Sequence, residues 1–336
     1  MDRAPPLPEG HAIWSLDGGT MGTTWSVRLV APPGSNPDAD RDVLSAAIQQ
    51  ELDAVVAVFS PWEPTSEISR FNAAPAGVWA LSSPLWTLLD AAMDMADDTN
   101  GAVDPTLGAL VDLWGFGPPG PRPIGTIPSD DEIAAALTVS GWQKLRLNRE
   151  ARAAMQTGGM KLDFSGIAKG HAVDRVSERL TAMGATSHLV EIGGELRGEG
   201  VKPDAQPWWV EIEQPPFMDA IGGAAPRMVV ALCGLAVATS GDYRRYYVAE
   251  GRLRSHTLDG AAGAPVDNGL ASVTVLHASA MKADAFATAL TVLGPDEGPE
   301  LAEAMQLAAH FILKTEHGPV ERMTPAWIAM MDEDQA

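Results

Sequence analysis

The hydrophobic and polar residues of this chain recur with two periods, one typical of helices and one typical of strands. Over residues 43–59 the apolar positions return every three or four residues, which predicts an amphipathic helix. Over residues 23–31 apolar and polar residues alternate, which predicts a half-buried strand. Similar patterns predict helices at 84–99, 129–137, 168–183, 282–293 and 300–310, and strands at 161–164, 187–192, 208–213, 228–239, 271–276 and 311–313.

The order of these elements determines the expected fold class. Helices and strands are mixed without a regular strand–helix–strand alternation, which favours an α+β fold over a doubly wound one. We therefore expect mixed, mainly antiparallel sheets with packed helices. No stretch has the composition of a linker between independent domains, so we predict one integrated domain over 21–315, after a flexible arm at 1–20 and before a C-terminal tail at 316–336.

Composition and charge narrow the classes of partner. The chain has 336 residues, of which 46% are hydrophobic, and it carries 23 Lys and Arg against 44 Asp and Glu, a formal net charge of −21. Such an acidic protein repels nucleic acid, and it has no basic cluster for anionic lipid. An anionic substrate would need a local cation, either a bound metal or a well-placed lysine. The single cysteine, Cys233, excludes an internal disulfide and is predicted to be a small buried residue.

The chain shows no sign of membrane insertion. Residues 1–10 are rich in proline and lack the apolar segment of a secretory signal, and no stretch of about 20 apolar residues could span a bilayer. We expect a soluble protein without a transmembrane segment. The compartment stays open between the cytoplasm and, with a leader that this sequence does not contain, the periplasm.

The first segment that can carry chemistry is residues 162–170, where a predicted strand turns tightly into a helix. Gly166 lets the backbone approach a ligand closely, and the helix N-terminus that follows can hold an anion. Lys169 adds a positive charge suited to a phosphate, and Asp163 can accept a hydrogen bond from a ligand. The alternative is an ordinary capped turn with a surface lysine.

A second segment places a carboxylate and a hydroxyl one helical turn apart. Asp284 and Thr288 are four residues apart in a predicted helix, so both side chains lie on one face. These hard oxygen ligands suit Mg²⁺, which commonly binds a few protein oxygens together with substrate phosphates. The alternative is a capping aspartate and a threonine bonded to a helix carbonyl.

Four further positions are candidates for proton transfer or ring binding. His256 lies in a polar loop and could transfer protons near neutral pH, although a structural role bonded to the backbone fits equally well. Asp104 precedes a proline that holds it extended, so it could bind the polar edge of a flat ring. Met21 and Trp62 could lie against such a ring, or simply pack in the core.

Taken in their order along residues 21–313, these segments resemble the ApbE family of FAD:protein FMN transferases. The segments that carry the resemblance are Met21 to Thr23, Ser66 to Asn72, Val103 to Thr106, Leu162 to Gly170 with Asp174, Ile192 to Gly194, Thr239 to Tyr243, His256 with Asp259 and Gly263, Ala271 to Val275, and Ala283 to Thr288.

The resemblance implies an ApbE-like fold with an FAD cleft between two parts, and it implies a role for each site residue. Asp284 and Thr288 would be Mg²⁺ ligands, with the backbone carbonyl of Gly166 as a third, and Asp284 and His256 would serve catalysis. The positions that would contact FAD are Met21, Trp62, Ala102, Val103, Asp104, Asp163, Lys169 and Leu258.

The sequence departs from the family pattern at three places. Trp62 stands where the family usually has tyrosine, and Gly166 replaces a more common alanine. Gly260, Ala261 and Ala262 replace the usual Pro-Arg-Thr, so any contact of that arginine is missing here.

The activity that the resemblance implies is a Mg²⁺-dependent transfer of FMN from FAD to a Ser or Thr hydroxyl of another protein, with release of AMP. The acceptor would be an electron-transfer flavoprotein. Two alternatives remain at this point: hydrolysis of FAD to FMN and AMP at the same site, and a protein that binds or delivers FAD without chemistry.

Overall fold

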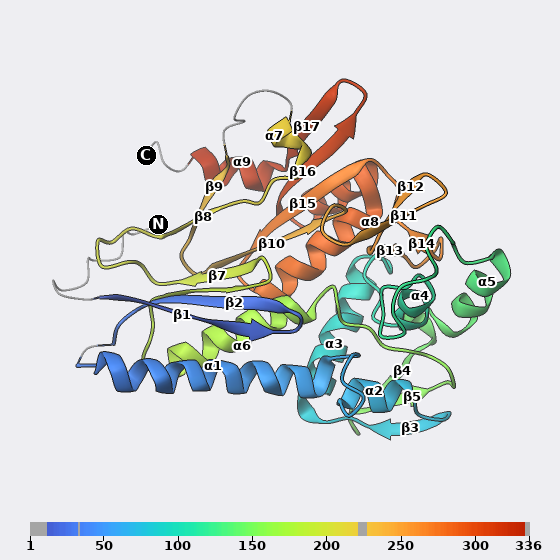
Figure 1. Ribbon diagram of the computed structural model, residues 1–336, viewed down its shortest axis with the longest axis horizontal. Helices are drawn as coiled ribbons and strands as arrows, with labels where there is room; N and C mark the ends of the chain where they lie inside the picture. Colours follow the sequence, from blue (N-terminus) through green and yellow to red (C-terminus); the bar gives the residue numbers. More distant parts are fainter. Residues whose placement is uncertain (1–11, 33, 221–226, 333–336) are drawn as a thin grey trace.

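The computed structural model describes residues 12–32, 34–220 and 227–332, and its centre is an eight-stranded antiparallel sheet (Figure 1). The strands follow the order β1-β2-β6-β7-β10-β15-β16-β17. Neighbouring strands are all antiparallel, as the sequence predicted. The strand bounds are Ile13–Thr20, Thr23–Val30, His188–Ile192, Glu195–Glu199, Leu235–Gly241, Leu270–His277, Ala308–Thr315 and Gly318–Met323.

Three long helices cover one face of this sheet, and smaller elements cover the other. Helices α1 (Pro37–Phe59), α6 (Ala168–Ala182) and α8 (Ala280–Ala304) lie on one side in Figure 1. Helix α9 (Pro325–Asp332), the short helix α7 (Phe217–Ala220) and the ribbon of β8 (Trp208–Glu211) and β9 (Val229–Leu232) lie toward the other. Within the described residues, no helix is long and apolar enough to cross a bilayer.

A second, smaller part of the fold packs beside one end of the sheet and helices (Figure 1). It contains a three-stranded sheet in the order β3-β5-β4 and two short ribbons, β11 with β12 and β13 with β14. The bounds of its elements are α2 Glu67–Asn72, β3 Gly77–Ala80, α3 Ser83–Asp98, α4 Gly108–Leu113, α5 Asp130–Val139, β4 Arg146–Asn148, β5 Ala153–Gln156, β11 Tyr246–Ala249, β12 Arg252–Ser255, β13 Leu258–Asp259 and β14 Ala264–Pro265.

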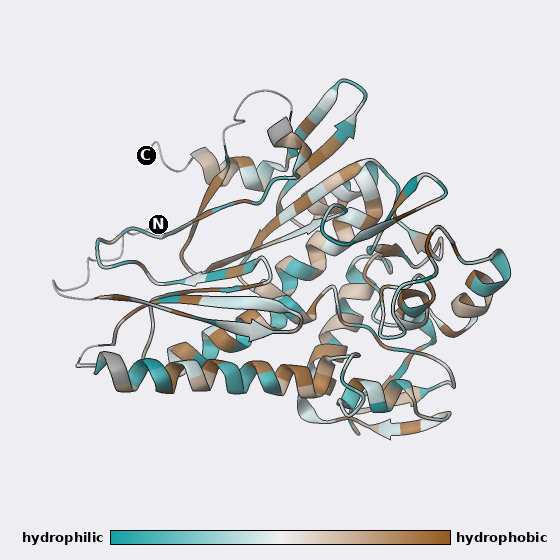
Figure 2. Cartoon of the chain, viewed as in Figure 1, coloured by the Kyte–Doolittle hydropathy of each residue, from teal (hydrophilic) through white to brown (hydrophobic). Residues whose placement is uncertain are grey.

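The strict alternation of side chains in the central strands builds a core on each face of the large sheet. In β10, Ala236 and Ala238 point into the main core under the helices, whereas Val237 belongs to the core under α9 and the β8–β9 ribbon. The main core also contains Leu85 and Leu88 of α3, so it continues into the smaller part. Figure 2 shows α1 changing from hydrophilic to hydrophobic toward the end that meets this part.

The structure corrects the expected ends of the domain. Residues 13–20 of the predicted arm form the edge strand β1, in which Trp14 and Leu16 are buried against the core; residues 1–11 lie outside the described residues. Residues 318–332 of the predicted tail likewise form β17 and α9, and the buried Trp327 packs α9 against His310 of β16; residues 333–336 lie outside the described residues.

Several internal elements also differ from prediction. Residues 161–164 form no strand, only one bridge between Lys161 and Leu107. The run 228–239 is two strands, because Gly234 turns the chain with φ of 72° and leaves Cys233 half-buried. The two helices predicted at 282–293 and 300–310 are joined across a kink at Gly294, and the second ends earlier, since β16 begins at Ala308.

Candidate active site

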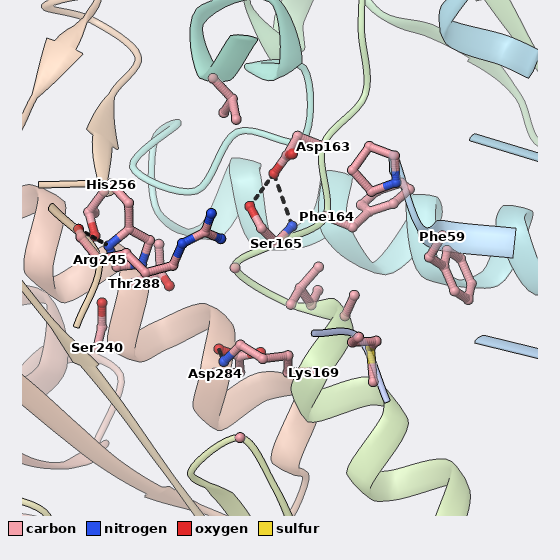
Figure 3. A pocket seen from close by; sticks show the side chains of 18 of the residues that line it. Phe59, Asp163, Phe164, Ser165, Lys169, Ser240, Arg245, His256, Asp284 and Thr288 are labelled. Carbon is pink, nitrogen blue, oxygen red and sulfur yellow. Dashed lines mark hydrogen bonds and ion pairs between the residues drawn. The ribbon is translucent and has the colours of Figure 1, made fainter. Parts of the chain in front are cut away.

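One cavity of about 990 Å³ receives every residue that the sequence predicted for the site. It is lined from both parts of the fold, by elements that are far apart in the chain (Figure 3). A cavity of this size fits a large small-molecule ligand. The predicted residues in its wall are Met21, Trp62, Ala102, Val103, Asp104, Asp163, Gly166, Lys169, His256, Leu258, Asp284 and Thr288.

The predicted metal ligands meet where α6 and α8 cross. The Gly170 amide donates a 3.0 Å hydrogen bond to Asp284 Oδ2, so one carboxylate oxygen is fixed by the backbone of α6. A Cβ built on Gly166 would lie 3.2 Å from Thr288 Oγ1, which places the turn before α6 directly beside the hydroxyl. Glycine at 170 is required for this approach, because a Cβ there would lie 2.2 Å from the Ala280 carbonyl oxygen.

These groups form a donor set that fits a Mg²⁺ ion. They offer a carboxylate, a hydroxyl and a backbone carbonyl, all hard oxygen ligands, beside a cavity that can supply substrate oxygens. In the part of the chain that the structure describes, no group of three or more His, Cys, Asp or Glu side chains is placed to hold a metal. A cation here would therefore depend on Thr288 and Gly166 as well as on Asp284.

The N-terminus of α8 is held in place by Asp174 of α6. Its carboxylate accepts hydrogen bonds from the amides of Ala280 and Met281 at 2.9 and 3.0 Å, and from Ser279 Oγ at 2.7 Å. It also pairs with Arg197 of β7. A carboxylate at a helix N-terminus satisfies free amides and is stabilised by the helix dipole. Asp174 thereby positions the helix that carries Asp284 and Thr288.

Lys169 lies between two carboxylates rather than facing the cavity unpaired. Its ammonium bonds to Glu195 and lies 3.9 Å from Asp284 Oδ1. Burial alone would lower the pKa of Lys169, but Asp284 and Glu195 raise it above its ordinary value. Burial raises the pKa of Glu195 to about 7, against the opposing charge of Lys169. The positive charge expected to serve a phosphate is thus already balanced by protein groups.

The carboxylates of Asp163 and Asp104 both accept hydrogen bonds from other residues of the protein. Asp163 accepts hydrogen bonds from the amide of Ser165, at 3.0 Å, and from its hydroxyl, as Figure 3 shows. Asp104 accepts from the amide and hydroxyl of Thr106 and from the amide of Trp142, at 2.6 to 2.9 Å. Burial raises the pKa of both carboxyl groups in spite of these bonds. Asp104 therefore offers a ligand mainly its backbone.

His256 follows β12 on the wall opposite Asp163 (Figure 3). Its Nδ1 lies 3.1 Å from the Arg245 carbonyl, which can only accept, so Nδ1 carries the proton and Nε2 keeps a lone pair. Burial, together with the charges of Arg245 and Lys169, lowers the pKa of His256 to about 4. The imidazole is consequently neutral near pH 7 and able to accept a proton.

The remaining predicted site residues are apolar and form walls suited to a flat ring. Trp62 is 49% exposed and lines the cavity, and the Arg245 guanidinium lies over its ring, with Cζ 5.9 Å from the ring centre. Met21 sits at the β1–β2 turn with φ of 48°, and Ala102 and Val103 are packed against α8. Leu258 is buried in a small cluster on the other side.

Sequence reasoning missed four charged residues of the cavity: Glu63, Glu195, Arg244 and Arg245. Glu63 directly follows the predicted Trp62. Glu195 lies just after the Gly193–Gly194 pair, and the two arginines directly follow Tyr243, so each adjoins a segment that carried the family resemblance. Their positions next to such segments were the only feature of the sequence that could have identified them as site residues. Their roles depend on partners from other elements, which no local pattern reveals.

Together, the sheet, the covering helices and the cavity define an α+β protein with a large ligand cleft and an enzyme-like arrangement of oxygen ligands and a neutral histidine. The profile of the ApbE family matches residues 21–311, and the chain belongs to this family. The α+β fold predicted from the sequence is confirmed by solved ApbE structures.

Named relatives and structures agree with this membership. The FAD:protein FMN transferase of Vibrio cholerae is 37% identical over 304 residues, covering 90% of this chain and 88% of the relative. That of Escherichia coli K12 is 34% identical, covering 93% and 88%. The apo structure of the Pseudomonas stutzeri flavinyl transferase ApbE has a TM-score of 0.85 at 38% identity, covering 95% of this chain and 97% of that one. The Vibrio cholerae flavin transferase ApbE has a TM-score of 0.85 at 34% identity, covering 95% and 99%.

Proposed function

We propose that this protein transfers the FMN part of FAD to a Ser or Thr hydroxyl of an acceptor protein and releases AMP. The observation that carries the proposal is the meeting of Asp284, Thr288 and Gly166 at the α6–α8 crossing, within the same cavity as the neutral His256. Membership of the ApbE family supports the same reaction. The family resemblance further suggests that the acceptor is an electron-transfer flavoprotein.

The cavity has separate regions for the two chemical parts of such a substrate. Trp62 and Met21 provide apolar surface for a flat flavin or adenine ring. The α6–α8 crossing provides oxygen ligands for a cation that would accompany the diphosphate. Asp284 Oδ1, Thr288 Oγ1 and the Gly166 carbonyl would hold Mg²⁺, which when bound would neutralise phosphate charge and stabilise the leaving AMP.

The chemical step proceeds as an in-line displacement at the FMN phosphorus. The acceptor hydroxyl oxygen forms a bond to that phosphorus, and the bond from phosphorus to the bridging oxygen breaks, so the electron pair leaves with AMP. The hydroxyl proton passes to Nε2 of His256, whose Nδ1–H is anchored on the Arg245 carbonyl. The low pKa of His256 keeps Nε2 unprotonated at neutral pH.

The test is incubation of the protein with FAD, Mg²⁺ and a candidate acceptor, followed by in-gel flavin fluorescence and assay of AMP. A fluorescent acceptor band and an equal amount of AMP are expected. Asp284→Asn should abolish both, whereas the matched control Asp296→Asn, an exposed residue of the same helix, should leave both unchanged. Free FMN and AMP without a labelled acceptor would instead indicate hydrolysis, and tight FAD binding without AMP would indicate a delivery protein.

A further inference from the structure

The cationic side chains that line the cavity differ in whether protein carboxylates neutralise them. Lys169 bonds to Glu195 and lies near Asp284. Arg244 pairs with Glu213 and lies 3.8 Å from Glu195. Both cations are therefore already balanced within the protein, and neither offers an uncompensated charge to a substrate.

Arg245 differs from both of these residues. Among the described residues, no carboxylate lies within ion-pair distance of its guanidinium, although the residue lines the cavity and is exposed. Figure 3 shows the side chain reaching from the wall of His256 toward Asp163 and Ser165. Burial raises the pKa of the Asp163 carboxyl group, and the positive charge of Arg245 acts in the opposite direction. Arg245 is thus the uncompensated cation of the cavity.

The backbone and one neighbouring ring hold this arginine in a defined position. Its carbonyl accepts hydrogen bonds from the His256 amide at 3.0 Å and from His256 Nδ1 at 3.1 Å. Its Cζ lies 5.9 Å from the centre of the Trp62 ring, a cation–π distance. A cation–π contact of this kind does not occupy the N–H donors of a guanidinium, which remain free to bind an anion.

We propose that Arg245 binds the phosphate on the FMN side of the dinucleotide. This assignment rests on the proposed function, because it is the presence of FAD that brings a phosphate to His256. Arginine binds phosphate through paired N–H donors, and its charge would hold the phosphate beside Nε2 of His256, the proton acceptor in transfer. Trp62 would position the guanidinium as well as provide a surface for the flavin or adenine ring.

A pair of flavins that differ in one phosphate tests the assignment directly. Equilibrium binding of FMN and riboflavin is measured by flavin fluorescence for the wild type, Arg245→Met, Arg245→Lys and the control Arg252→Met. Arg252 is an exposed arginine of β12 outside the cavity lining, so it controls for the loss of one positive charge. Circular dichroism and thermal unfolding establish that each variant is folded.

We expect Arg245→Met to raise the Kd for FMN about tenfold and to leave the Kd for riboflavin unchanged. Arg245→Lys should recover part of the FMN affinity, because it keeps the charge but loses the paired donors. Arg252→Met should match the wild type with both flavins. A parallel increase in Kd for FAD is expected.

Two results would overturn the assignment. Equal weakening of FMN and riboflavin would show that Arg245 supports Trp62 rather than the phosphate, and unchanged FMN affinity would show no contact. The proposed transfer can fail independently of this assignment. The wild type could bind FMN more tightly than riboflavin through Arg245 and still never label an acceptor. That result would refute transfer but would support the phosphate contact.

Discussion

The backbone amide of Gly170 holds one oxygen of the Asp284 carboxylate at 3.0 Å, across the crossing of α6 and α8. This bond fixes Oδ2 and directs Oδ1 to the side of Lys169 and the cavity. Asp284 is 5% exposed, so its orientation depends on how closely the two helices approach. The geometry of the proposed cation site therefore depends on Gly170, which allows the two helices to approach because it has no side chain.

Gly170→Ala should disrupt this site. The added Cβ would lie 2.2 Å from the Ala280 carbonyl oxygen and 2.8 Å from Asp284 Cβ, so the helices must separate. We expect the free energy of unfolding to fall by about 1–3 kcal/mol, as for other overpacked sites, and flavin transfer to fall with it. Denaturant unfolding and the transfer assay measure the two effects.

The matched control for that variant is Gly19→Ala. Gly19 lies in strand β1, and a Cβ there would meet nothing closer than 3.8 Å. It should change neither stability nor activity by a measurable amount. A Gly170→Ala protein with wild-type stability and transfer would show that close helix approach is not needed for the site.

Thr288→Val tests the hydroxyl as a ligand, because valine keeps the shape and removes the oxygen. We expect transfer at limiting Mg²⁺ to fall about tenfold or more, with a higher Mg²⁺ requirement, whereas Thr288→Ser should keep most activity. Titration of the transfer rate with Mg²⁺ measures the effect. Thr291→Val, one turn further along α8, serves as control, since Thr291 bonds to the Ala287 carbonyl and does not line the cavity. Equal Mg²⁺ requirements for Thr288→Val and wild type would contradict the ligand role.

The pair Asp284 and Thr288 could be predicted from sequence because helical spacing alone puts both on one face. The same holds for the capping box of Ser129 and Glu132, which the structure contains. Lys169 was predicted as a phosphate-binding charge, but local sequence could not show that Glu195, on β7, already pairs with it. Such pairs depend on which elements the tertiary fold brings together.

The edge strand β1 was missed for a different reason. Its alternation of buried Trp14 and Leu16 is short and ends in glycines, a composition typical of loops. Gly18 is needed there because the Trp25 indole of β2 lies 2.6 Å from the position of a Cβ. The glycine that weakens the strand signal is thus required by packing, which only the structure reveals.

Asp174→Ala should loosen the N-terminus of α8. The change removes acceptors for the amides of Ala280 and Met281 and for Ser279 Oγ. We expect the free energy of unfolding to fall by about 2–3 kcal/mol, together with a loss of transfer. Asp130→Ala, an exposed first-turn residue of α5, should change stability by less than about 0.5 kcal/mol. Similar values for the two variants would refute the anchoring role of Asp174.

The low pKa of His256 predicts an unusual pH dependence. A histidine of ordinary pKa, near 6.5, would lose its proton-accepting form below that pH, whereas His256, with its pKa lowered to about 4, stays neutral. The rate of the transfer step should therefore show no His256-dependent decline between pH 7 and about pH 5. The unfolded chain takes up this proton near pH 6.5, so His256 should also make stability fall as pH drops from about 6.5 toward 4.

Single-turnover transfer from pH 5 to 8, at saturating FAD and Mg²⁺, measures the first effect, and denaturant unfolding over the same range measures the second. His256→Asn should slow transfer at every pH in this range, because the amide cannot take the acceptor proton. It should also reduce the loss of stability toward acid, since the unfolded chain then gains one proton fewer. NMR follows the protonation of His256 over the same range. If the wild-type rate halves near pH 6.5 as His256 becomes protonated, the cavity does not keep the imidazole neutral. The assignment of Nε2 as proton acceptor at low pH would then be wrong.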